Sequence, residues 1–170
     1  MGIRTEYLQF LLKNSEITKA KLLELGNQLI KDGCGGHFKT GKALFCSMGC
    51  YHMSIDENGL DGAMNYDLGK KITDFDDEFD IITDFGTSIC VKNYKMCYEN
   101  IYRMCKPGGV MIYILPEENS NWKANYYVDK KFFRDLAKKQ GSKVKNIEII
   151  NGLHGDLVCA ALVKNEPIQQ

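Results

Sequence analysis

The chain has 170 residues, a length that suits one domain better than two. Hydrophobic residues make up 44% and charged residues 26%, and Lys+Arg (22) equals Asp+Glu (22), so the formal net charge is zero. This balance is that of an ordinary globular protein and gives no general attraction to nucleic acid or to an anionic membrane.

The sequence has no apolar run of the about 20 residues that span a bilayer. Its first residues lack the basic and apolar regions of a secretory signal. We therefore expect no membrane association and one domain over residues 1–170, with an N-terminal helix in 1–18, a core in 19–164 and a tail in 165–170.

The cysteines argue against a disulfide framework and against a metal site. They number seven, and no two have Cys-x-x-Cys spacing. We expect mostly buried, reduced thiols, no bound metal and a cytoplasmic setting. The seven are Cys34, Cys46, Cys50, Cys90, Cys97, Cys105 and Cys159.

The first third of the chain alternates between helical and strand patterns. Residues 5–13 have helical apolar spacing, and the short apolar run 20–26 ends at a glycine, as a buried strand does. A glycine-rich loop at 32–36 follows. The pattern then predicts a helix over 38–50 and a second strand over 51–56.

The middle of the chain continues this alternation. We predict a short third strand at 63–67 and a fourth strand at 79–86, closed by a glycine. Asn93 can cap a helix that the Lys-Pro-Gly-Gly turn at 106–109 ends. The unbroken apolar run 110–115 is typical of a strand with both faces covered.

The C-terminal third predicts a loop at 116–127, a helix that Asp129 caps and Gly141 ends, and two strands at 144–150 and 157–163. The connection between these last strands is too short for a helical crossover, so they should be antiparallel. The predicted fold is α/β and doubly wound, with a mostly parallel seven-stranded sheet and a C-terminal antiparallel hairpin. Ligands bind such sheets at the carboxyl ends of the strands.

Acidic or small residues stand at four successive predicted strand ends. A carboxylate after the second strand can accept both hydroxyls of a ribose, one near the third can receive an adenine amine, and one after the fourth can hold an ammonium group. Taken singly, each acidic residue has another explanation, as a surface charge, a turn former or a helix cap. The residues are Glu24, Gly26, Asn27, Asp56, Asp67, Asp84 and Gly86.

Three segments resemble the class I S-adenosylmethionine (SAM)-dependent methyltransferases. Residues 21–26 (Lys-Leu-Leu-Glu-Leu-Gly) resemble the family's Glu-x-Gly opening, and 79–86 resemble its fourth strand. Residues 100–110 resemble its helix, Lys-Pro-Gly-Gly turn and fifth strand. The resemblance implies SAM as cofactor, bound near Glu24, Gly26, Asn27, Asp56, Asp67, Leu68, Asp84, Phe85 and Gly86.

The sequence also departs from that family at two points. Asn27-Gln28-Leu29 follow Gly26, where relatives carry further glycines, and Ile89-Cys90-Val91 replace a Glu-His-Val-like step. NAD is the nearest rival ligand, but it needs a Gly-x-Gly-x-x-Gly cradle for its pyrophosphate, which is absent after Gly26. SAM has no phosphate, so the loop favours SAM.

An acceptor that starts protonated needs a base. Glu117 follows Pro116 at a strand end and is our first candidate; Glu118, Tyr126 and His154 are others, with His154 expected at the surface. Trp122 and Tyr126 are predicted to form a wall of the acceptor site. Alternatively, these aromatic side chains pin the loop onto the core.

Three functions remain open from the sequence. The first is methyl transfer to a small-molecule acceptor, which suits a chain with little room for a separate recognition domain. The second is a catalytically silent module of the same fold that binds a partner protein. The third is methylation of nucleic acid or protein with the help of the basic residues in 130–139, although a solvated outer helix face explains those charges as well.

Overall fold

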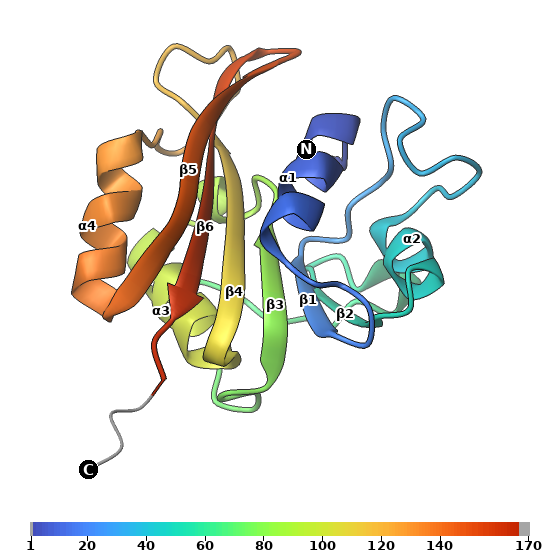
Figure 1. Ribbon diagram of the computed structural model, residues 1–170, viewed down its shortest axis with the longest axis horizontal. Coiled ribbons are helices and arrows are strands. Elements are labelled where there is room, and N and C mark those ends of the chain that lie inside the picture. The colour runs from blue at the N-terminus through green and yellow to red at the C-terminus, as the bar shows by residue number, and fades with distance from the viewer. Residues whose placement is uncertain (1, 167–170) are drawn as a thin grey trace.

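A computed structural model describes residues 2–166 of the chain (Figure 1). The four α-helices, two short 3-10 helices (η) and six strands follow one another as α1 (Thr5–Asn14), β1 (Lys21–Leu25), α2 (Gly41–Ser47), β2 (Tyr51–Ile55), η1 (Leu60–Gly62), β3 (Phe79–Asp84), η2 (Ser88–Cys90), α3 (Tyr94–Met104), β4 (Cys105–Pro116), α4 (Lys130–Gln140), β5 (Ser142–Gly152) and β6 (Gly155–Lys164).

The strands form one mixed sheet in the order β2-β1-β3-β4-β6-β5. The first four run parallel to one another, whereas β6 is antiparallel to both β4 and β5. This confirms the α/β fold and the terminal hairpin. The chain moves outward in one direction from β1 to β2 and in the other from β3 to β4. A topological switch point therefore lies between the carboxyl ends of β1 and β3.

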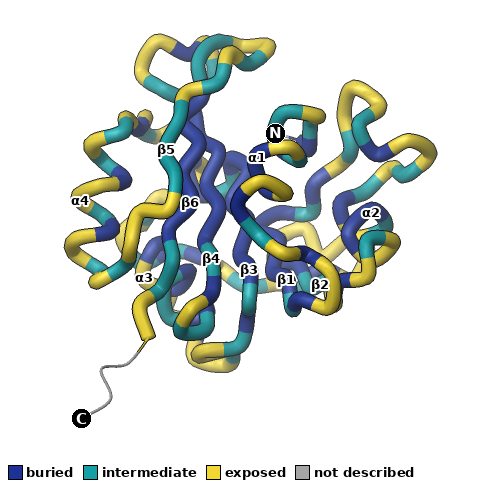
Figure 2. Tube along the Cα trace, viewed as in Figure 1, coloured by how far each residue is buried: buried dark blue, intermediate teal, exposed yellow. Residues whose placement is uncertain are grey.

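Helices cover both faces of the sheet (Figure 1). Alternate strand residues divide between two buried clusters, because successive side chains of a strand point to opposite faces. Leu22 and Ile112 pack with α1 and α2, whereas Leu23 and Met111 pack with α3 and α4. In Figure 2 the tube is accordingly most continuously buried along β1, β3, β4 and β6, whereas the edge strand β5 is half-buried or exposed along its length.

The predicted strand count of seven is not confirmed, because residues 63–67 do not form a strand. Met64 alone makes a parallel bridge to Ile55. A turn follows, in which the Lys70 N–H donates to the Asp67 carbonyl (3.0 Å) and the carboxylate of Asp67 accepts a hydrogen bond from the backbone N–H of Gly69 (2.8 Å). A run this short has too few apolar residues to distinguish one bridge from a ladder.

Helix boundaries follow the capping signals where these are strong. Asn93 accepts a hydrogen bond from the Met96 N–H (3.4 Å), Asp129 accepts one from the Phe132 N–H (2.6 Å), and Gly141 ends α4 at φ +68°. The helix predicted over 38–50 is shorter, since it begins after a Thr40 cap. Among residues 2–166, the helices are all too short or too polar to cross a bilayer.

Candidate functional site

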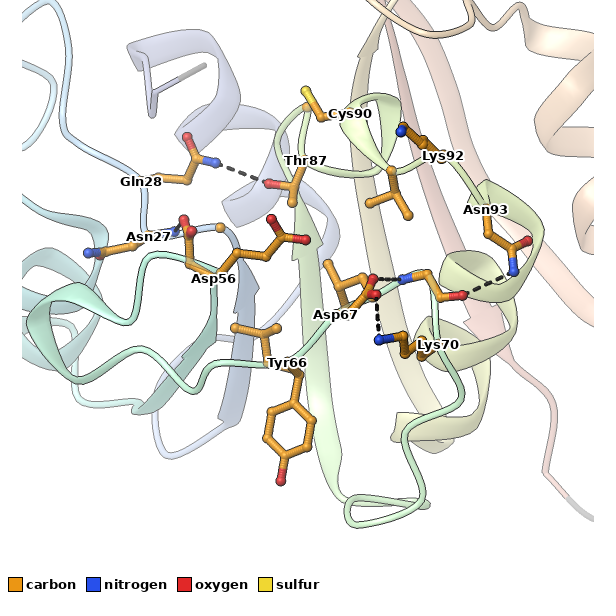
Figure 3. Close-up of a pocket in the computed structure, with 17 residues that line it drawn as sticks. Asn27, Gln28, Asp56, Tyr66, Asp67, Lys70, Thr87, Cys90, Lys92 and Asn93 are labelled. Atoms are coloured by element: carbon orange, nitrogen blue, oxygen red, sulfur yellow. Dashed lines mark hydrogen bonds and ion pairs between the residues drawn. The ribbon is translucent and has the colours of Figure 1, made fainter.

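A pocket of about 720 Å³ opens at the carboxyl ends of the parallel strands, over the switch point. Its walls come from the loops after β1, β2 and β3 and from the segment that precedes β3 in the chain (Figure 3). The residues of this first pocket are Gly26, Asn27, Gln28, Ile55, Asp56, Glu57, Tyr66, Asp67, Leu68, Gly69, Lys70, Gly86, Thr87, Cys90, Val91, Lys92 and Asn93.

Gly26 makes the turn that leads from β1 into this pocket. Its φ is +80°, and a Cβ there would lie 2.5 Å from the Thr87 Oγ1, so a side chain is excluded both by conformation and by space. The Thr87 hydroxyl donates to the Leu25 carbonyl (2.7 Å), and the Gln28 amide donates to the Thr87 Oγ1 (3.3 Å; Figure 3). These bonds tie the two loops of the switch point together.

Asp56 is the first residue beyond β2 and lines the pocket. Its Oδ2 accepts from the backbone N–H of Asn27 (2.7 Å), and its Oδ1 accepts from that of Asn58 (3.0 Å). Each carboxylate oxygen can still accept a further hydrogen bond. Glu57 places a second carboxylate on the same wall. The pair is suited to a ligand that presents hydroxyl groups.

Asp67 and Leu68 line the side of the pocket formed by residues 66–70. The carboxylate of Asp67 holds the Gly69 N–H and pairs with Lys70 at 3.5 Å (Figure 3). Leu68, together with Ile55 and Val91, supplies apolar surface. This combination suits a flat ring with polar groups at its edge.

Asp84 and Phe85 do not line the first pocket. Asp84 is the last residue of β3, and its Oδ1 accepts from the N–H groups of Thr87 (2.9 Å) and Ser88 (3.1 Å). Burial raises the pKa of this carboxyl group, and its hydrogen bonds offset only part of that effect. The ring of Phe85 packs in the core, 5.7 Å from that of Tyr7. Asp84 therefore holds the loop after β3 in its conformation through these hydrogen bonds and does not line the pocket itself.

Glu24 is likewise buried and absent from the pocket wall. Its Oε2 lies 2.9 Å from the Nε2 of His52, and both side chains are essentially inaccessible to solvent. Burial raises the pKa of Glu24, with partial compensation from His52. The carboxylate therefore joins β1 to β2 inside the sheet and has no direct path to a ligand.

A second pocket, of about 410 Å³, adjoins the first, since Gly86 and Cys90 line both. It lies between the loop after β3, the loop after β4 and the turn of the β5–β6 hairpin. The remaining residues that line it are Ile89, Asn121, Trp122, Lys123 and His154. Two adjoining spaces at one sheet edge can hold two reactants side by side.

The predicted acceptor-site residues divide between this pocket and the core. Trp122 lines the second pocket. Tyr126 lines neither pocket; its hydroxyl donates to that of Tyr98 (3.1 Å), and its ring lies 4.6 Å from that of Tyr94. Tyr126 thus follows the alternative explanation, in which an aromatic side chain pins the loop onto the core.

The predicted base, Glu117, also lies outside both pockets. Its backbone N–H donates to the Asp156 carbonyl (3.0 Å), which fastens the loop after β4 to the hairpin. His154, expected to be a simple surface residue, is exposed but lines the second pocket, with its ring 4.7 Å from that of Trp122. Nothing in the local sequence reveals this contact, because the two residues are far apart in the chain.

Sequence reasoning missed several residues of the first pocket. Gln28 lies two positions after the predicted strand end at Gly26, and Thr87, Cys90 and Lys92 lie one, four and six positions after the predicted strand end at Gly86. A glycine followed by Thr-Ser, as at Gly86, is the one available signal of a tight loop there. Within residues 2–166, no three His, Cys, Asp or Glu side chains gather as a metal site would require.

No protein-family model matches the sequence, and no curated protein matches it. Solved structures do match in fold. A SAM-dependent methyltransferase from Mesorhizobium loti aligns at a TM-score of 0.70 with 11% identity, over 95% of this chain and 98% of that one. The N-methyltransferase NodS from Bradyrhizobium japonicum WM9, in complex with S-adenosylhomocysteine (SAH), aligns at 0.68 with 15% identity, over 95% and 85%.

A third similar structure contains two bound molecules. It is the 1,6-didemethyltoxoflavin-N1-methyltransferase from Burkholderia thailandensis, with bound 1,6-didemethyltoxoflavin and SAH; its TM-score is 0.67 and its identity 11%, over 88% of this chain and 72% of that one. The fold of this chain is that of the class I SAM-dependent methyltransferases. The resemblance seen in three sequence segments therefore extends to the whole described fold.

Proposed function

We propose that this protein binds SAM in the first pocket and transfers its methyl group to a small-molecule acceptor in the second. The observation that carries the proposal is that the two pockets adjoin one another, with Gly86 and Cys90 in the walls of both, over the switch point of a methyltransferase fold. The fold alone would leave open a protein that binds SAM without acting on anything, but the adjoining pocket gives an acceptor a place beside the cofactor.

The residues of the first pocket fit the parts of SAM. Asp56 and Glu57 offer carboxylate oxygens to the ribose hydroxyls, and Ile55, Leu68 and Val91 offer apolar surface to the adenine. A volume of about 720 Å³ lies within the range of sites for ligands of this size. The bare backbone at the Gly26 turn lets the amino-acid end of the cofactor approach β1 closely.

When bound, SAM supplies an electrophilic methyl group on a sulfonium. The contribution of the chain is to hold the acceptor in line with that methyl group and to exclude water from the contact. Gly86, at the junction, has no side chain to block the passage between the pockets. The loops on its two sides, residues 87–93 and 121–125, determine how closely the reactants approach.

The cysteines support the cytoplasmic setting expected from the sequence. All seven are free, and Cys50, Cys97, Cys105 and Cys159 are buried. Burial also raises the pKa of the Cys50 thiol, to about 11, which disfavours the reactive thiolate. A reducing compartment is therefore part of the proposal.

Isothermal titration calorimetry tests the cofactor directly. SAM and SAH should each bind the intact chain with 1:1 stoichiometry, and NAD, the control, should produce no binding heat. Absence of heat with both sulfur compounds would end the proposal, while binding of NAD in their place would move the protein to another class. A subsequent assay with methyl-labelled SAM and small-molecule acceptors measures transfer.

A further inference from the structure

We propose that His154 accepts the proton of the methyl acceptor, and that the acceptor is a small planar aromatic molecule with an acidic O–H or N–H. This inference rests on the proposed methyl transfer and adds to it a catalytic residue and a substrate class.

His154 is the suitable base among the residues of the second pocket. The others there are Gly86, Ile89, Cys90, Asn121, Trp122 and Lys123. Of these side chains, only the imidazole is a neutral group whose nitrogen lone pair readily takes up a proton. Because His154 is exposed, it can pass the proton on to solvent after each turnover.

The hairpin is held so that this imidazole stays in the pocket wall. The Asn121 N–H donates to the carbonyl of His154 (2.7 Å), and Gly155 has a φ of +106°. A Cβ on Gly155 would lie 2.8 Å from the Cα of Ser120, so only glycine lets the hairpin approach the loop this closely. The rings of His154 and Trp122 then meet edge to face, with an interplanar angle of 78°.

The same walls define the acceptor. Trp122 and Ile89 provide the flat, apolar contact that an aromatic ring needs. A volume of about 410 Å³ suits one ring or two fused rings, since it is near the lower end of ligand pockets, about 300–1,000 Å³. Lys123, the one fully charged side chain on this wall, favours an acceptor with an acidic group. Asp156, the nearest carboxylate along the hairpin, is engaged with Asn151 at 2.9 Å.

In the step itself, the acceptor's O–H or N–H proton passes to the free imidazole nitrogen of His154. The lone pair left on oxygen or nitrogen forms the new bond to the methyl carbon. The electrons of the broken C–S bond remain on sulfur, which leaves SAH, a methylated acceptor and an imidazolium that loses its proton to water.

Methyl transfer to defined acceptors tests this role. The compounds are 4-hydroxybenzoate, catechol and phthalimide, each paired with a compound that lacks the acidic hydrogen: benzoate, benzene and N-methylphthalimide. We expect transfer only to the first three. In His154→Gln, kcat should fall about 100-fold, and the pH dependence of kcat due to the histidine should disappear, while SAH affinity stays unchanged. His37→Gln, at an exposed histidine outside both pockets, is the matched control.

Two outcomes overturn the inference while leaving the proposed function intact. One is SAH binding without transfer to any of the O–H or N–H compounds. The other is transfer that is equally fast in His154→Gln, above all if Glu117→Gln loses activity in its place. If SAH itself does not bind, the proposed function fails first.

A second readout does not depend on turnover. Trp122 is the single tryptophan of the chain, so its fluorescence reports on the second pocket alone. Protonation of the adjacent imidazole should quench this emission, and the pH-dependent change should be absent in His154→Gln. An identical titration in the variant would mean that the two rings do not meet in solution, and would overturn the inference.

Discussion

Four carboxylates mark the ends of the first three parallel strands and the approach to the third, and they have two different environments. Asp56 and Asp67 lie in loops beyond the sheet and line the first pocket. Glu24 and Asp84 lie within the last two residues of β1 and β3 and are buried, with exposures of 0% and 1%. A shift of one or two positions along the strand therefore separates a side chain that can reach a ligand from one that supports the loop.

The largest expected effect is a difference in folding stability between variants of the buried carboxylates and variants of the carboxylates that line the pocket. In Asp84→Ala, the half-buried N–H of Thr87 and the buried N–H of Ser88 lose their acceptor. We expect the free energy of unfolding to fall by about 3 kcal/mol, because each unpaired buried donor costs about 1–3 kcal/mol. Urea unfolding measures the loss. Asp67→Ala, at the rim, should lose less than about 1 kcal/mol, and equal losses would contradict the division into two pairs.

The next effect separates them by ligand affinity. In Asp56→Asn, one carboxylate oxygen becomes an amide donor and the charge is lost, so the proposed bonds to the ribose weaken. SAH should bind about 30-fold more weakly, which corresponds to about 2 kcal/mol for hydrogen bonds to a charged group. Calorimetry with SAH measures the change. Glu118→Gln, at an exposed carboxylate outside both pockets, should bind as the wild type does, and unchanged affinity in Asp56→Asn would refute the ribose assignment.

Which carboxylate belongs to which pair could not be predicted from the sequence. The apolar runs and turn residues predict where β1, β2, β3 and β4 occur along the chain, because hydrophobic periodicity and turn-forming residues are local properties of the sequence. They do not predict at which residue the pairing of two strands ends, as β1 and β3 do at Leu25 and Asp84, with an accuracy of one residue. Burial of a strand-end carboxylate depends on that single position and on the helices packed over it.

The residues that line the second pocket were harder still to predict from the sequence. Trp122 was assigned to an acceptor site on the general behaviour of aromatic side chains in loops, and it does line a pocket. His154 could not be assigned there, because its place depends on the antiparallel register of β6 with β4 and on the close approach of Gly155 to Ser120. Both are long-range features that no window of neighbouring residues contains.

The burial of Asp84 also predicts that folding stability depends on pH. Burial raises the pKa of Asp84 above its ordinary value of 3.8. The folded chain therefore keeps this proton after the unfolded chain has lost it, and the contribution to stability falls as pH rises from 3.8 towards the folded pKa. Asp84→Asn keeps an acceptor oxygen for Thr87 and Ser88 but cannot ionise.

We expect the stability of Asp84→Asn relative to the wild type to increase with pH over this range. Urea unfolding at pH 4.5, 6 and 7.5 measures the difference. Glu118→Gln, at an exposed carboxylate, should give a difference that does not vary with pH. A constant difference for Asp84→Asn would mean that this carboxyl group is not desolvated as the structure indicates.

The smallest effect concerns the two carboxylates of the rim themselves, which are not equivalent. Asp67 already holds the Gly69 N–H and pairs with Lys70, so less of its charge is available to a ligand than at Asp56. In Asp67→Asn the acceptor oxygen for Gly69 is retained, and SAH affinity should fall only about 3-fold, because an exposed electrostatic contact to the ligand contributes about 0–1 kcal/mol. The same calorimetric titration measures it. If Asp67→Asn instead weakened SAH binding more than Asp56→Asn, the principal anchor of the nucleoside would lie on the 66–70 side of the pocket, and the ribose and adenine assignments would have to be exchanged.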